Sequence, residues 1–193
     1  MDRGFIKPIL KSDRSVFTTR DLQLLWNEPS ISIVKNRISY YIRSGDLLRL
    51  RRGLYVKDNQ YDRLEMATRI YTPAYISFET VLGAAGVTFQ HYSQIFVASY
   101  QTKEINVYGQ SISFLTLKDT ILMNSMGLEN REFYMIASPE RAFLDRVYLT
   151  PNYHFDNLAL LDWEKVNELL PVFGGNEQMR RRVEIYENSR RFK

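Results

Sequence analysis

The side chains best suited to chemistry in this sequence are basic and short polar ones between residues 32 and 52. Lysine and arginine neutralise phosphate groups, while serine and asparagine reach the hydrogen-bonding edges of bases. Their mixture in one segment therefore predicts a nucleic-acid interface. The predicted phosphate contacts are made by Lys35, Arg37, Arg43, Arg49, Arg51 and Arg52, and the predicted base contacts by Ser32, Asn36 and Ser39.

Three residues add detail to this prediction. The amide of Asn36 can pair with adenine through two hydrogen bonds. Tyr40 and Tyr55 belong to the same basic segment, so we expect them near the backbone or ribose of the nucleic acid. Base stacking on RNA is the alternative use of such tyrosines.

The polar residues around Asn36 require a helix to present them on one face. Val34, Ile38 and Tyr41 recur at intervals of four and three residues, which is typical of an amphipathic helix. Gly45 is a common residue just after a helix. The spacing therefore predicts a helix over residues 31–44, with its apolar stripe buried and its polar face in solvent.

The arginine-rich stretch after this helix has the pattern of a small hairpin. Residues 48–51 alternate like a half-buried strand, residues 52–53 form the turn, and residues 54–57 form the return strand. Two helices are expected before residue 31. One covers residues 4–11, and the next begins at a capping box formed by Thr18 and Asp21.

Three helices followed by a hairpin is the order of a winged helix-turn-helix domain. Its third helix enters the major groove of DNA, and the hairpin is the wing beside it. The same pattern also fits a small helical domain with a charged surface, or a winged helix that binds protein. Three arginines within four residues of the hairpin, Arg49, Arg51 and Arg52, favour DNA.

The charge divides the chain into two modules. Residues 1–60 carry 12 basic and 6 acidic side chains, whereas residues 61–179 carry 8 and 14. A basic tail follows, with 6 basic and 2 acidic side chains in residues 180–193. A polar run at residues 58–62 is the expected boundary.

We therefore expect an α+β protein of two domains. Residues 1–60 form a winged helix-turn-helix DNA-binding domain, and residues 61–193 form a mixed α/β domain with a small sheet and C-terminal helices. In the second domain, Ser77, Ser138, Asp162 and Asn176 are expected to cap helices. The expected strands cover residues 94–100, 103–108, 112–117 and 133–137.

The composition argues against an enzyme. The chain has no cysteine, which excludes disulfides, thiolate catalysis and cysteine-ligated zinc. His154 and Asp156 can be written as a base with its orienting partner or as two metal ligands, but no phosphate loop or Gly-x-Ser-x-Gly motif accompanies them. We predict no catalytic, metal or cofactor site. No apolar run approaches the ~20 residues of a membrane span, so we expect a cytoplasmic protein without a membrane partner.

One charged cluster stands out in the second domain. Arg141 and Asp145 lie one helical turn apart and can form an ion pair. Together with Glu140 they are expected on the surface of a helix, where a solvated pair is the first interpretation and a contact with a protein partner the second.

Three segments resemble the AbiEi-type antitoxins, which also act as transcriptional regulators. Residues 44–55 are similar to the wing of that family, residues 75–82 to a helix start in its C-terminal domain, and residues 136–145 to a strand-to-helix junction. The resemblance covers most of the chain.

The resemblance implies two activities. The N-terminal domain would bind double-stranded DNA at the operator of its own operon and repress it. The C-terminal domain would counter a nucleotidyltransferase-like toxin, directly or indirectly. The alternative is a stand-alone winged-helix transcription factor whose second domain senses a signal or binds another protein.

Overall fold

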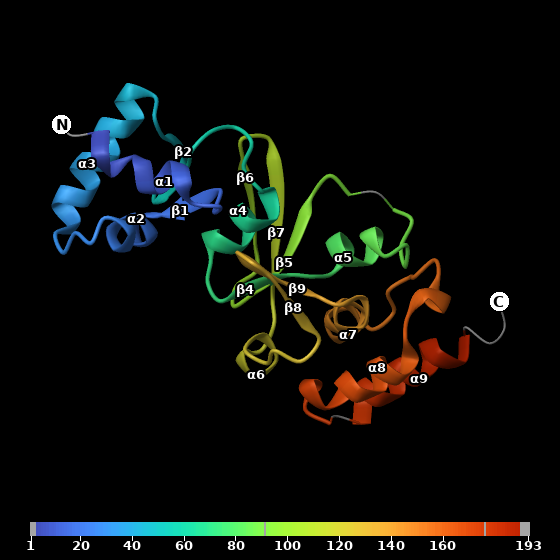
Figure 1. The fold of residues 1–193 in the computed structure, drawn as a ribbon. Coiled ribbons are helices and arrows are strands. Elements are labelled where there is room, and N and C mark those ends of the chain that lie inside the picture. The colour runs from blue at the N-terminus through green and yellow to red at the C-terminus, as the bar shows by residue number, and fades with distance from the viewer. Residues whose placement is uncertain (1–2, 91, 176, 190–193) are drawn as a thin grey trace. The chain divides into compact units, whose positions relative to one another are not determined.

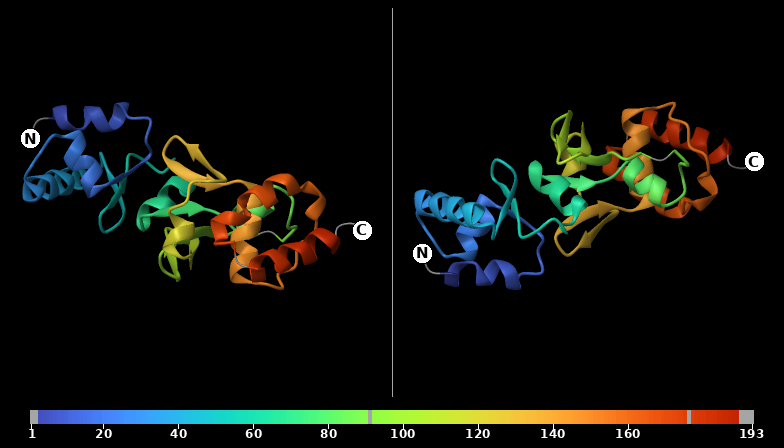
Figure 2. Two further views of the ribbon diagram at one scale, coloured as in Figure 1. Left: turned by 90° about the horizontal axis from the view of Figure 1, so that it is seen from below. Right: turned by 90° about the horizontal axis from the view of Figure 1, so that it is seen from above.

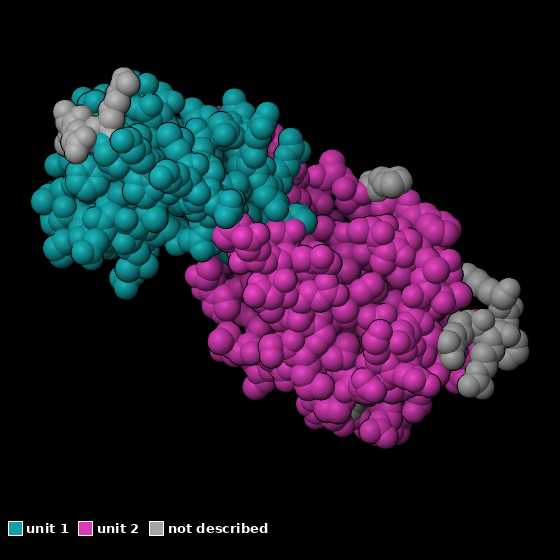
Figure 3. All heavy atoms as spheres, viewed as in Figure 1, with its two compact units in different colours: residues 1–70 teal, residues 71–193 magenta. Residues whose placement is uncertain are grey.

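The computed structural model describes residues 3–90, 92–175 and 177–189, and its architecture is α+β (Figures 1 and 2). Helices accompany a three-stranded sheet and a mixed six-stranded sheet. The chain divides into two compact units, residues 1–70 and residues 71–193, which Figure 3 colours separately. Within the described ranges, none of the helices combines the length and the apolar character needed to cross a bilayer.

The first unit consists of short helices around a small antiparallel sheet with the strand order β1-β3-β2. Its elements are a 3-10 turn (Arg3–Phe5), α1 (Lys7–Lys11), β1 (Val16–Thr18), α2 (Thr19–Leu25), α3 (Ile31–Ser44), β2 (Leu48–Arg51), β3 (Leu54–Val56) and α4 (Arg63–Ile70).

The predicted helices and hairpin of this unit are confirmed, and one strand was missed. The side chain of Thr18 accepts from Asp21 N and the side chain of Asp21 accepts from Thr18 N, which completes the capping box of α2. Gly45 ends α3 with φ at 80°, a conformation that glycine adopts without strain. Strand β1 lies between the two helices predicted before residue 31, where no strand was predicted. Three residues are too few to reveal the two-residue alternation of apolar and polar side chains that is typical of a strand. Strand β1 is defined by the pairing of Val16 and Thr18 with β3.

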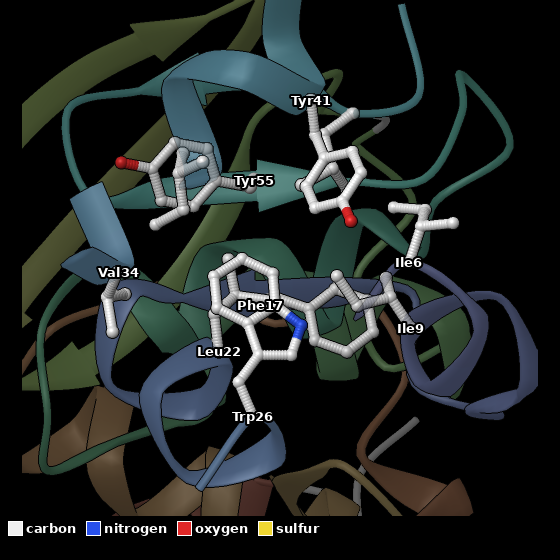
Figure 4. Close-up of a cluster of buried hydrophobic side chains, with 10 residues drawn as sticks. Ile6, Ile9, Phe17, Leu22, Trp26, Val34, Tyr41 and Tyr55 are labelled. Carbon is white, nitrogen blue, oxygen red and sulfur yellow. The ribbon is translucent and has the colours of Figure 1, made fainter. Parts of the chain in front are cut away.

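The core of the first unit collects apolar side chains from α1, β1, α2, α3 and β3 (Figure 4). The indole nitrogen of Trp26 donates to the carbonyl oxygen of Phe5 at 2.7 Å, which ties the end of α2 to the N-terminal segment. The buried residues of this cluster are Ile6, Ile9, Phe17, Leu22, Trp26, Val34, Ile38, Tyr41, Leu47 and Tyr55.

Helix α4 is bound to the first unit by a network of charged groups. Glu65 is 1% exposed, and its carboxylate accepts from Ser15 N at 3.0 Å and from Ser15 Oγ at 2.6 Å. Arg69 pairs with Glu65 at 3.1 Å and with Asp21 at 2.9 Å. The first unit therefore ends at Ile70 and not near residue 60. The polar run that predicted a boundary leads instead into a helix belonging to the same unit.

The second unit is built on a six-stranded sheet with the order β6-β7-β5-β4-β9-β8. Strands β5 and β7 pair in parallel, as do β4 and β9, and the other pairs are antiparallel. Its strands are β4 (Ala74–Ile76), β5 (Ile95–Ser99), β6 (Lys103–Val107), β7 (Gln110–Thr116), β8 (Leu128–Arg131) and β9 (Tyr134–Ala137). The four predicted strands correspond to β5, β6, β7 and β9, whereas β4 and β8 were not expected.

The helices of the second unit form two layers. Two of them contact the sheet, and two pack on one of these helices. Helix α5 contacts β5, helix α7 contacts β9, and both α8 and α9 pack against α7. The rings of Phe155, Trp163 and Tyr186 surround the ring of Phe143, with centroids 4.9 to 5.6 Å away. The helices are α5 (Glu79–Ala84), α6 (Asp119–Leu122), α7 (Pro139–Leu149), α8 (Trp163–Leu169) and α9 (Glu177–Ser189), with 3-10 turns at Leu158–Leu160 and Leu170–Phe173.

Two of the expected caps in this unit are confirmed. The side chain of Ser138 accepts from Arg141 N at the start of α7, and Asp162 accepts from the first backbone N–H groups of α8. Asn176 lies outside the described residues. Ser77 is not a cap, because its hydroxyl is buried and donates to Asp145 at 2.7 Å, while Phe78 precedes α5.

The ion pair expected on a helix surface is instead fully buried. Arg141 and Asp145 are each 0% exposed, and Arg141 Nε donates to the Asp145 carboxylate at 3.1 Å. The guanidinium also donates to the carbonyl oxygens of Ile121 and Met126, both at 2.7 Å. Glu140 is buried as well. The expectation was wrong because helix periodicity does not show that a helix is covered on both sides.

Tyr75 completes this buried cluster. Its hydroxyl accepts from Arg141 at 2.8 Å and donates to Asp145 at 3.0 Å. Burial and the neighbouring Asp145 carboxylate raise the pKa of Tyr75, so the phenol stays protonated and able to donate. The cluster thus joins β4, α7 and the loop after α6 through satisfied polar groups.

The role of α4 is testable with two fragments. Removing α4 leaves the backbone N–H groups of Ser15 and Val16 without the Glu65 carboxylate that they bond. Because each hydrogen bond to a charged group contributes about 1.5–3 kcal/mol, a fragment of residues 1–60 should be at least about 3 kcal/mol less stable than residues 1–70. Urea denaturation followed by circular dichroism measures this difference. Equal unfolding midpoints would contradict the assignment of α4 to the first unit.

Candidate nucleic-acid interface

Helix α3 exposes the polar face that its sequence predicts. Val34, Ile38 and Tyr41 are buried in the core of the first unit. An α-helix turns once every 3.6 residues, so burying this stripe directs the residues between its members outward. The predicted contact residues that lie exposed on α3 are Ser32, Lys35, Asn36, Ser39 and Arg43.

The exposed charges and amide of α3 are not committed to other protein groups. Within the described ranges, Lys35, Asn36 and Arg43 form no ion pair and no side-chain hydrogen bond. Ser39 donates its hydroxyl to the carbonyl oxygen of Lys35 at 2.9 Å, a local bond that leaves the oxygen able to accept. This face therefore offers one amide, two hydroxyls and two positive charges to a ligand.

Arg37 is a correction to the predicted set. It is 8% exposed, and its guanidinium carbon lies 3.7 Å from the centroid of the Phe5 ring and 5.2 Å from that of Trp26. Its Nη2 is 3.5 Å from the carboxylate of Glu28. The position falls beside the buried stripe of α3, so this arginine packs the N-terminal segment onto the helix and is not available to a phosphate.

The hairpin of β2 and β3 presents its arginines as predicted, with one difference. Leu50 and Tyr55 point into the core, while Arg49 and Arg52 are exposed and Arg51 is half-buried. Tyr55 is therefore not available to a nucleic acid. The hairpin is joined to the start of α2, because Thr19 N donates to Gly53 O at 3.2 Å.

The charged side chains among the predicted contact residues of α3 and the hairpin are all basic. The polar face of α3 and the hairpin follow each other through the short turn after Gly45. Tyr40 stays half-buried beside Tyr41, with ring centroids 5.3 Å apart.

Ile31 and Ile33 were not identified from the sequence as candidate contact residues. Both are exposed in the first turn of α3. Their apolar character at positions off the buried stripe was the available signal.

The second unit offers no comparable arrangement around its histidine. His154 Nε2 is 3.5 Å from Asp156, but the histidine is exposed and Asp156 accepts from Phe89 N at 2.7 Å. Asp156 therefore holds a loop in place. His91 lies outside the described residues. Among the residues that the structure describes, no group of three or more histidine, cysteine, aspartate or glutamate side chains could hold a metal ion.

Comparison with known proteins adds no further information. No protein-family model matches the chain, and no curated protein matches it.

Two arginines of α3 provide a matched test of this geometry. Arg37→Ala removes a buried guanidinium from its aromatic contacts and deletes the ion pair with Glu28, so it should lower stability by about 1–3 kcal/mol. Arg43→Ala changes an exposed side chain and should stay within about 0.5 kcal/mol of the parent chain. Urea denaturation of both variants checks this contrast, and equal losses would mean that Arg37 is not a packing residue.

Proposed function

We propose that this chain is a transcriptional regulator whose first unit binds double-stranded DNA as a winged helix-turn-helix domain. The observation that carries the proposal is the exposed, uncommitted polar face of α3 followed directly by an arginine-rich hairpin. A helix, a short strand, two further helices and a hairpin, in this order, are typical of that domain. Helix α3 is then the recognition helix, and β2 with β3 is the wing.

The contacts divide by chemistry. Lys35 and Arg43 on α3, with Arg49, Arg51 and Arg52 on the wing, bind phosphates, which positions the domain without reading sequence. Ser32, Asn36 and Ser39 lie along the centre of the exposed face and bind base edges. The excess of basic side chains in residues 1–60 attracts the polyanion to this domain.

We further propose that the chain represses its own operon and acts as an antitoxin against a nucleotidyltransferase-like toxin. This part rests on the resemblance to AbiEi-type antitoxins. Arg141 and Asp145 of the residue 136–145 motif are buried, so these two motif residues stabilise the domain, and the toxin must be recognised through other residues. The alternative remains a stand-alone regulator whose second unit senses a signal or binds another protein.

The wing is tested by the salt dependence of DNA binding. Each phosphate contact releases counterions, so Arg49→Ala and Arg52→Ala should each reduce the slope of log K against log salt by about 1 and weaken all duplexes alike. Arg131→Ala, an exposed arginine of the second unit, is the matched control and should change neither. Gel shifts at several salt concentrations give both quantities. Unchanged slopes in both wing variants would remove the wing from the interface.

The antitoxin role is tested by growth rescue with the full chain. Expression of a nucleotidyltransferase-like toxin encoded beside this gene should arrest growth, and the full chain should restore it. The double variant Arg49→Ala/Arg52→Ala should lose operator binding but still rescue growth, because the two activities belong to different units. The absence of a neighbouring toxin gene, or failure of the full chain to rescue, would favour the stand-alone regulator.

A further inference from the structure

The first turn of α3 exposes two apolar side chains that the polar contacts leave unexplained. Ile31 and Ile33 are each 45% exposed, although neighbouring positions of the same helix bury their apolar residues completely. Their branched side chains also have lower helix propensity than the straight-chain residues that usually occupy a solvated helix surface. Neither the core nor the sheet of the first unit accounts for isoleucine at these positions.

Ile33 lies at one edge of the exposed face and is the neighbour of Asn36, which lies near the centre of that face. Residues three apart on a helix have Cβ atoms about 5–6 Å from each other. Ile33, Asn36 and Tyr40 follow at three- and four-residue intervals, so they lie on one stripe of the α3 surface. A ligand group that touches Asn36 therefore has an apolar surface beside it on the N-terminal side.

Ile31 lies on the other edge of the helix. One turn further along the chain from Ile31 is Lys35, an exposed positive charge suited to a phosphate. The two isoleucines are equally exposed and belong to the same helical turn, but they have different neighbours. Ile33 lies beside the proposed base contact Asn36, and Ile31 lies beside the proposed phosphate contact Lys35.

The major groove presents one apolar group to such an edge, the C5-methyl of thymine. We propose that Ile33 packs against a thymine methyl group and thereby selects thymine close to the base pair that Asn36 contacts. This inference rests on the proposed function. Because base pairs are stacked about 3.4 Å apart, the 5–6 Å between Ile33 and Asn36 places the thymine one or two base pairs away.

The experiment combines a protein substitution with removal of the methyl group. The probe is the tightest-binding duplex that the full chain selects from a randomised library, together with copies in which single thymines are replaced by deoxyuridine. Asn36→Ala locates the base pair that this residue reads. A buried methyl group contributes about 0.8 kcal/mol, and a tenfold change in Kd corresponds to about 1.4 kcal/mol. Deoxyuridine at the contacted thymine should therefore weaken the full chain about three- to fivefold.

The variants decide whether Ile33 is responsible. Ile33→Ala should bind the thymine and deoxyuridine duplexes equally at that position, while Ile31→Ala should keep the three- to fivefold preference. Both side chains are exposed, so thermal unfolding followed by circular dichroism should be unchanged. A selected site with no thymine within two base pairs of the Asn36 contact, or a preference that persists in Ile33→Ala, would overturn the inference while DNA binding stands. Failure of the full chain to bind any duplex would instead overturn the proposed function.

Discussion

The burial of one face of α3 is the constraint on which the first unit depends. Val34, Ile38 and Tyr41 occupy the core formed with α1, α2 and the sheet, and Arg37 extends this contact onto the ring of Phe5. Rotating the helix by one residue would bury Lys35 and expose Ile38, which combines the cost of burying a charge with the loss of a buried apolar side chain. The packing of the buried face thus determines which face of α3 is exposed. The candidate interface is this exposed face.

Charged groups play a structural part in both units, because buried carboxylates and arginines bond each other and nearby polar groups. In the first unit, Glu65 and Asp21 share Arg69 and together fix α4, β1 and the start of α2. In the second unit, Arg141 and Asp145 bond each other and their remaining polar atoms reach backbone carbonyls and hydroxyls. Removing one member of such a set leaves an unpaired buried charge, which is strongly destabilising. These residues therefore hold neighbouring helices and strands together.

This use of charge separates residues that build the fold from those that can meet a partner. The arginines at positions 37 and 141 are internal, while those at 43, 49 and 52 face solvent. The residue 136–145 motif carries part of the family resemblance, and its Arg141 and Asp145 are both buried on α7. The Arg141–Asp145 pair is therefore part of the interior of the second unit and is not exposed on its surface.

Much of the local structure follows from the sequence. The capping box at Thr18, the glycine after α3, the hairpin arginines and the cap at Ser138 act over a few residues, and local patterns record them. The face of α3 was also predictable, because Val34, Ile38 and Tyr41 recur at helical intervals.

Tertiary structure alone decided the rest. Strands β1, β4 and β8 have three or four residues each, and pairing with distant strands defines them. Whether an arginine meets water depends on what packs over it, and Arg37 and Arg141 are covered by segments distant in the chain. The observed boundary after Ile70 differs from the predicted one near residue 60 for the same reason. The hydrogen bonds from Ser15 to Glu65 join α4 to a segment 50 residues earlier. Periodicity reports which side of an element is apolar, but long-range contacts determine which polar groups are enclosed with it.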